Sequence, residues 1–178
     1  MKKYIKSADY NSGDDFGYGY DSNGEAIDFS TVQELYRIAN QDILPQTELG
    51  QIGDTDIDED SFEFYFGGGI QGAVLDYIIH FDTTDEQLDL MSFVKPNARF
   101  YPDFNSDKYT ADIRFSIHVH MSNIKVEFLE ADVYENNTYS DYFSDDFRED
   151  FDWKRMQEIV KEIAEPAVRE IHATLSNL

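Results

Sequence analysis

The stretch YTADIRFSIHVHMSNIKVEFLEADVY, residues 109–134, carries the clearest structural pattern in the chain. Apolar residues alternate with polar ones in its first half, with Ile113, Phe115, Ile117 and Val119 as the apolar set. Strict alternation is typical of a β-strand with one buried face. The alternation resumes after a turn signal at Ser122–Asn123. The stretch therefore predicts a long antiparallel hairpin.

The second half of this stretch changes parity near Phe128. Ile124 and Val126 share one parity with Phe128, whereas Ala131 and Val133 follow the other. A strand with period two must gain a residue or turn its face at such a point. We therefore expect a β-bulge or a change of face near Phe128.

A second hairpin is predicted near residues 62–81. FEFYF at 62–66 alternates and is aromatic, and AVLDYIIHF at 73–81 is apolar enough for a buried strand. The glycines that begin at Gly67 separate the two and mark a turn.

Helical spacing appears near 31–43 and near 153–176. Ser30, with Gln33 three residues later, resembles a capping box, and Asp152 is a fitting N-cap for the last helix. Pro166 should kink that helix or divide it. We predict one α+β domain over residues 1–178, with an antiparallel sheet packed against these two helices.

The charge is extreme: 37 Asp and Glu stand against 14 Lys and Arg, giving a net charge of −23. Solubility of a small domain needs a net charge of only about 2–8, and the surplus opposes compaction. Aromatics make up 15% of the chain, far more than acidic disordered tails contain. Every third of the chain is net negative, so the charge belongs to a folded domain.

The amino terminus has no apolar signal-peptide core, and no apolar run reaches the roughly 18 residues of a membrane-spanning helix. There is no cysteine, which fits a reducing compartment. We therefore expect a soluble cytoplasmic protein without membrane contact.

Two acidic clusters are candidate partner-binding patches. The first contains Asp54, Asp56, Asp58, Glu59 and Asp60. The second contains Asp141, Asp145, Asp146, Glu149, Asp150 and Asp152. On an extended strand, alternate carboxylates lie about 6.6–6.8 Å apart on one face, so Asp54, Asp56 and Asp58 predict such a row. Glu130 and Asp132, on the outside of the hairpin, complete the predicted binding set.

The second cluster is interleaved with Tyr142, Phe143, Phe147, Phe151 and Trp153. Such aromatics can attach the segment to the core and hold its carboxylates in place. Lys and Arg bind carboxylates and phosphates in similar ways, so fixed carboxylates can imitate phosphates. We expect exposed Tyr139, Tyr142 and Phe143 to add specificity.

In charge, size, absence of cysteine and absence of catalytic motifs, the chain resembles the acidic DNA-mimic inhibitors of phages and mobile elements, the anti-restriction and anti-CRISPR proteins. That class contains many unrelated folds, so the resemblance implies a function and no site residue. The implied function is a non-enzymatic inhibitor that blocks the basic nucleic-acid channel of a nuclease, such as a CRISPR effector or a restriction enzyme. The partner is then a basic protein, with no direct binding of nucleic acid and no cofactor. A two-fold dimer would extend the acidic surface, but the sequence does not require one.

Four alternatives remain open. The acids can form an ordinary solvated surface, or the chain can be an immunity-type protein that neutralises a basic nuclease toxin. His118 and His120 share one strand face and, with His80 or an acid, can hold a metal in a small accessory domain. The stretch that begins at Asp54 resembles a calcium-binding loop, but Glu59 and Tyr65 occupy the positions where that loop needs glycine and glutamate.

Overall fold

The centre of the sheet is the long hairpin, formed by β4 (Tyr109–His120) and β5 (Asn123–Glu135). The computed structural model describes residues 29–66, 73–84, 86–98, 102–104, 106–120 and 123–177. The alternating apolar residues of β4 are buried, with Ile113 and Ile117 fully enclosed. Their burial removes apolar surface from water and gives the hairpin its packed face.

The predicted bulge lies at Leu129. Arg114 pairs with Glu130 and Phe115 with Phe128, so Leu129 has no residue opposite it on β4. The extra residue restores the side-chain alternation, because Phe128 and Ala131 both face the core despite their opposite parity. The prediction near Phe128 is confirmed.

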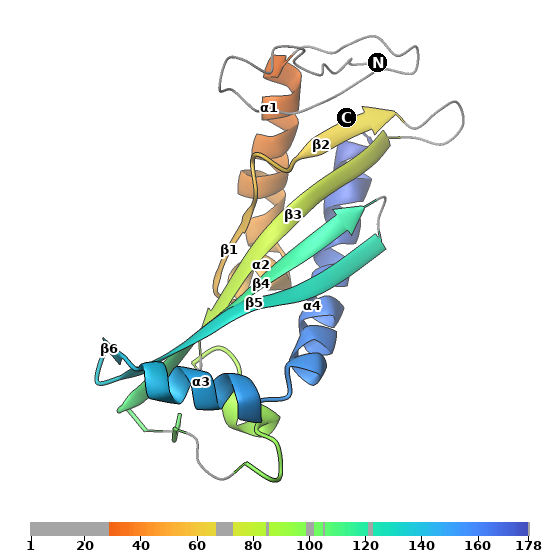
Figure 1. The fold of residues 1–178 in the computed structure, drawn as a ribbon. Helices are drawn as coiled ribbons and strands as arrows, with labels where there is room; N and C mark the ends of the chain where they lie inside the picture. Colours follow the sequence, from red (N-terminus) through yellow and green to blue (C-terminus); the bar gives the residue numbers. More distant parts are fainter. Residues whose placement is uncertain are drawn as a thin grey trace, which may run out of the picture.

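β3 (Ala73–Thr84) pairs antiparallel with β4, and its other edge pairs with β1 (Asp54–Ile57) and β2 (Glu63–Phe66). The β2–β3 pairing confirms the second predicted hairpin, whose glycine turn at 67–72 lies outside the described residues. The path of paired strands is β1-β3-β4-β5-β6, with β2 beside β3. The described part of the chain therefore contains an antiparallel sheet with helices, and the α+β class is confirmed (Figure 1).

β6 (Thr138–Tyr139) returns from β5 through a tight turn at Asn136 and Asn137. Their φ angles of 51° and 61° are both positive, as a two-residue type I′ hairpin requires. Asparagine tolerates this left-handed backbone better than most residues.

The first helix is α1 (Phe29–Arg37), which continues as the π-helical segment η1 (Ile38–Ile43). Ser30 is thus a residue of this helix and not its N-cap, because the helix already includes Phe29. A 3-10 turn η2 (Leu44–Gln46) and the short α2 (Glu48–Gln51) follow, and Pro45 is placed at the start of the 3-10 turn, where it needs no N–H partner.

The last helix is α4 (Trp153–Leu175), with Asp152 as its N-cap: the carboxylate accepts the Arg155 N–H at 3.1 Å, as predicted. Pro166 does not divide the helix, which is continuous on both sides of it. Pro166 is exposed on this helix. Before α4 comes α3 (Asp141–Asp150), a helix that the sequence patterns did not predict, and between β3 and β4 lies the 3-10 turn η3 (Leu90–Phe93).

α1 and α4 lie on one side of the sheet, and α3 crosses its lower end beside β5 (Figure 1). The core forms between the sheet and this helical layer, where Phe81, Phe115, Met156 and Val160 are buried. Trp153 stacks on Phe128 with ring centroids 3.9 Å apart and fastens α4 to β5. The opposite side of the sheet carries no described helix over its centre, and we call it the open face.

Candidate partner-binding surface

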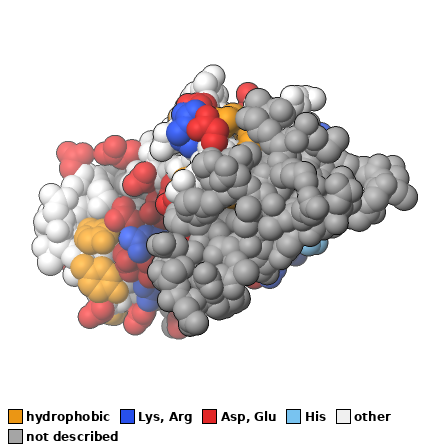
Figure 2. Space-filling view, turned by 90° about the horizontal axis from the view of Figure 1, so that it is seen from above, with side chains coloured by type: hydrophobic (Ala, Val, Ile, Leu, Met, Phe, Trp, Pro, Cys, Tyr) orange, Lys and Arg blue, Asp and Glu red, His pale blue; other side chains and the backbone are white. Residues whose placement is uncertain are grey.

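The open face collects the polar residues that alternate with the core residues of β1, β3, β4 and β5. Its acidic members are Asp54, Asp56, Asp76, Asp82, Asp112, Glu127, Glu130 and Asp132. Arg114 and Lys125 are its basic members, and His80, His118 and His120 complete the charged set. The face is therefore strongly negative. In the view from above, Asp and Glu side chains also outnumber Lys and Arg on the described surface that is visible (Figure 2).

One row of side chains crosses the open face from edge to edge. Asp54 lies opposite Asp82, Asp82 opposite Arg114, and Arg114 opposite Glu130. Arg114 donates from Nη1 to Glu130, and its Nε lies 3.5 Å from an Asp82 oxygen. A single guanidinium thus separates and orients two carboxylates, because its donors point in fixed directions.

A second row places Asp112 directly opposite Asp132. Opposed like charges on neighbouring strands destabilise a sheet. Partial burial raises the pKa of the Asp112 carboxyl, and Asp132 raises it further, although Arg114 acts in the opposite direction. Burial also raises the pKa of Asp82, and the nearby carboxylates of Asp54 and Asp112 add to the effect. These carboxylates are held close together at a cost in electrostatic free energy.

Three carboxylates of the two rows line a hollow of about 500 Å³. Asp54, Asp82 and Asp112 line it together with Arg114, and Thr84 and Gln87 close one end. The Gln87 side chain accepts the Thr84 N–H at 3.0 Å, which ties the loop after β3 to the strand. Three carboxylates against one guanidinium make the hollow net negative, so its charge favours a cationic side chain over a neutral one.

Arg148 connects the open face to α3. Its Nη2 lies 3.2 Å from Asp132, and its Nη1 lies 3.2 Å from Asp145 on the same helix. The helix itself is held by Ser144, whose buried hydroxyl accepts the Val133 N–H of β5 at 2.9 Å. Phe143 and Phe147 are buried below it, so α3 presents Asp145 beside the sheet in a fixed position.

The two predicted clusters lie at opposite edges of the sheet. Asp54 and Asp56 lie on β1, and Asp58, Glu59 and Asp60 follow in the turn after it. Asp141, Asp145, Asp146, Glu149 and Asp150 lie on α3, beside β5. Three strand spacings of about 4.8 Å separate β1 from β5. The clusters are therefore not neighbours, but the carboxylates of β3, β4 and β5 form a connection between them.

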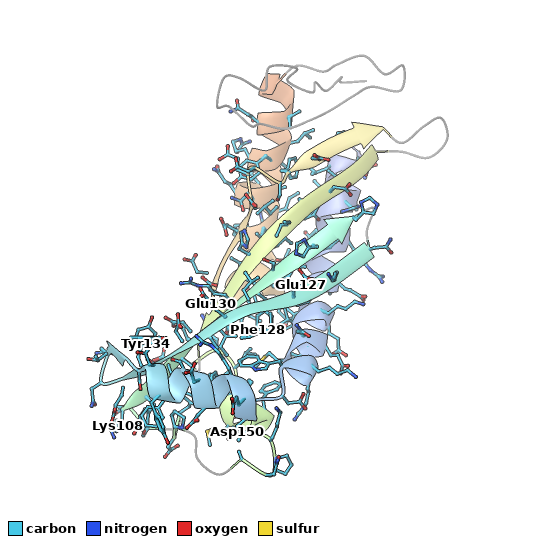
Figure 3. All side chains as sticks on the ribbon, in the orientation of Figure 1. Lys108, Glu127, Phe128, Glu130, Tyr134 and Asp150 are labelled. Atoms are coloured by element: carbon cyan, nitrogen blue, oxygen red, sulfur yellow. The ribbon has the colours of Figure 1, made fainter. Side chains whose placement is uncertain are left out.

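The predicted residues differ in their structural roles. Asp54, Glu130 and Asp132 lie on the open face, and Figure 3 shows Glu130 beside Glu127 and Tyr134 along β5, with Asp150 on α3. Asp152 caps α4, so its carboxylate serves the helix. One oxygen of Asp58 accepts the Asp60 N–H at 3.1 Å within the turn.

Each histidine of the open face lies next to a carboxylate. His118 Nε2 is 3.0 Å from Glu127 on β5, whereas His120 Nδ1 is 2.8 Å from Asp76 on β3. His80 Nε2 lies 3.7 Å from Asp58. His118 and His120 share a face as predicted, but they turn to opposite neighbouring strands. In the described ranges, no group of three His, Cys, Asp or Glu side chains has the geometry of a metal site.

The exposed aromatics differ from the prediction in one member. Tyr139 and Tyr142 are exposed, at 45% and 63%, but Phe143 is buried. Phe143 packs edge-on against Tyr109 of β4, with ring centroids 5.2 Å apart, because it lies on the sheet side of α3. It therefore belongs to the core and cannot contact a partner.

Sequence reasoning missed Asp82 and Asp112, which line the hollow. Asp112 occupies a polar position of a predicted strand, and Asp82 directly follows another predicted strand. The alternation of polar and apolar residues was therefore a usable signal for both. Their proximity depends on the register between β1, β3, β4 and β5, which alternation does not specify.

Comparison of the chain with protein-family models, with curated proteins and with solved structures found no match. Among the helices of the described residues, none is long and apolar enough to cross a membrane.

Proposed function

We propose that this protein is a non-enzymatic inhibitor whose open face, with the adjoining edge of α3, occupies the basic nucleic-acid channel of a nuclease. It acts by occupancy: while the acidic surface fills the channel, DNA or RNA cannot enter. The proposal needs no cofactor and no chemical step.

The observation that carries this proposal is the opposition of carboxylates across paired strands, as in Asp54 with Asp82 and Asp112 with Asp132. An ordinary solvated surface gains nothing from placing like charges opposite each other, and loses stability. A basic partner compensates this repulsion on binding. The raised pKa values of Asp82 and Asp112 express the same repulsion and burial in the free protein.

Spacing also supports a nucleic-acid channel as the target. Alternate residues of a strand lie about 6.6–6.8 Å apart, and neighbouring strands lie about 4.8 Å apart, so the carboxylates of the open face are carried on a grid of these spacings. Rows of carboxylates on neighbouring strands form a polyanionic surface, less dense than duplex DNA with its one charge per about 1.7 Å of helix axis. Lys and Arg side chains that line such a channel bind carboxylates as they bind phosphates.

The test is a panel of purified nucleases that includes CRISPR effectors, restriction enzymes and toxin nucleases. Cleavage is measured as this protein is added, at several concentrations of salt and of DNA. We expect inhibition of at least one enzyme at low salt. It should fall steeply between about 50 and about 200 mM salt, and added DNA should relieve it competitively.

Two outcomes contradict the proposal. In one, no nuclease is inhibited even at low salt, which would mean that the acidic surface interacts only with solvent. In the other, inhibition persists unchanged as DNA increases, because the protein then binds outside the channel. Selective inhibition of a toxin nuclease would identify the protein as an immunity-type inhibitor that uses the same surface.

A further inference from the structure

The open face ends in a pair of tyrosines beside its second acidic row. Tyr134 on β5 lies opposite Tyr139 on β6, and their ring centroids are 6.0 Å apart at an interplanar angle of 70°. Asp132 precedes Tyr134 by two residues, so both side chains lie on the same face of β5. The exposed ring of Tyr139, the partly buried ring of Tyr134 and two carboxylates therefore meet at one corner of the sheet.

The carboxylates of this corner are not equally satisfied. Asp132 pairs with Arg148 at 3.2 Å. No described side chain forms an ion pair with Asp112, although Arg114 attracts it from a longer distance. Asp112 and Asp132 both raise the pKa of the Tyr134 phenol, after burial as the larger cause, so both carboxylates act on this ring. The corner has unbalanced negative charge next to an aromatic surface.

We propose that Tyr134, Tyr139, Asp112 and Asp132 form a binding site for an arginine side chain of the basic partner. This inference rests on the proposed function. A guanidinium stacks on an aromatic ring and donates to a carboxylate at its edge at the same time, because it is planar and carries several donors. The exposed Tyr139 ring supplies the stacking surface, and Asp132 on the adjacent strand β5 and Asp112 on β4 supply the carboxylate acceptors.

Lysine fits this corner less well. Its ammonium group is a compact, strongly hydrated charge that pairs with carboxylates but stacks poorly. The rest of the open face attracts both cations, since it offers carboxylates without exposed rings. The part of a preference for arginine over lysine that depends on the Tyr139 ring therefore reports on the corner, whereas the affinity common to both reports on the acidic face as a whole.

The experiment is calorimetric titration with oligoarginine and oligolysine peptides of equal length, at the same salt concentration. Wild-type protein should bind oligoarginine more tightly by about two- to fivefold, the range that one exposed cation–π contact gives. Tyr139→Thr should remove this preference and leave the affinity for oligolysine unchanged. Tyr139→Phe should retain the preference, because the ring is kept.

Tyr142→Ala is the matched control, because Tyr142 is more exposed than Tyr139 but lies on α3 outside the pair. It should leave the arginine preference intact. Equal affinity of wild-type protein for the two peptides, or an unchanged preference in Tyr139→Thr, overturns the inference. If arginine preference appears while no nuclease is inhibited, the proposed function fails and the arginine site stands.

Discussion

Asp112 lies opposite Asp132, and partial burial raises the pKa of its carboxyl. A carboxyl whose pKa is raised by folding binds protons more readily in the folded state, so its charge opposes folding at neutral pH. Asp112→Asn should therefore increase the free energy of unfolding at pH 7 by a few tenths of a kcal/mol, a size limited by solvent screening.

The sign of this effect is testable by pH. As pH falls toward the acidic range where Asp112 takes up a proton in the folded state, the wild-type protein loses its repulsion and the difference from Asp112→Asn should shrink. Urea unfolding of both proteins at several pH values measures it. A variant that is less stable than wild type at pH 7 would contradict the claim that Asp112 opposes folding.

His172 on α4 is partly buried, and its pKa is shifted in the opposite direction from that of Asp112. Its ring lies 5.9 Å from Tyr77, and its Nε2 atom has no hydrogen-bond partner among the described residues. Burial lowers the pKa of His172, although Asp76 acts in the opposite direction. The unfolded chain therefore takes up this proton first as pH falls below about 6.5, and the folded protein loses stability from there downward.

His172→Phe should reduce this loss, because phenylalanine keeps an aromatic ring and does not titrate. We expect the unfolding temperature of wild type to drop further between pH 7.5 and pH 5.5 than that of the variant. The other histidines are the same in both proteins and cancel in the comparison. Equal pH dependence would show that His172 is already protonated or solvated in the fold.

One buried side-chain hydrogen bond helps to hold α3 on β5. Ser144 accepts the Val133 N–H at 2.9 Å, and its side chain is fully enclosed. Ser144→Ala should cost about 1–3 kcal/mol, because it leaves a buried N–H without a partner. Urea unfolding measures the loss, and Ser176→Ala, at an exposed serine, is the control. A change of less than a few tenths of a kcal/mol would mean that water replaces the hydroxyl.

α3 is a helix that the sequence patterns did not predict, whereas the strands of the sheet were predictable. Both hairpins and the bulge followed from alternation, because period two is visible without knowledge of the fold. α3 was missed because its acids dominate the pattern. Ser140, which caps it by accepting the Phe143 N–H, and the buried pair Phe143 and Phe147 four residues apart were the available signals. The predicted attachment of this segment to the core is confirmed for Phe143, Phe147 and Phe151, which are buried, and wrong for Tyr142, which is exposed. The separate expectation that Phe143 is exposed was wrong.

At the scale of the molecule, the net charge of −23 is partly organised by the sheet. Carboxylates from β1, β3, β4 and β5 meet in two cross-strand rows, and α3 adds Asp145 through Arg148. The local density of Asp and Glu in the sequence pointed to residues 54–60 and 141–152 as the binding patches. Asp82 and Asp112, isolated in sequence, lie between those clusters because strand pairing brings them there. Their position between the clusters follows only from the register of several paired strands.

The central claim is that the open face, and not the total charge, binds the partner. Its most direct test compares two triple variants that each remove three negative charges. Asp54→Asn, Asp112→Asn and Asp132→Asn act on the open face. Glu158→Gln, Glu162→Gln and Glu170→Gln act on exposed positions of α4, on the helical side.

The measurement is the inhibition constant for the most sensitive nuclease of the panel, at fixed salt, after both variants have been shown to fold. We predict that the open-face variant inhibits about tenfold less well, since each exposed charge pair contributes roughly 0.5 kcal/mol. The inhibition constant of the α4 variant should stay within about twofold of the wild-type value, because the charges it removes contribute only long-range attraction. Equal losses in both variants, or a loss only in the α4 variant, would contradict the account.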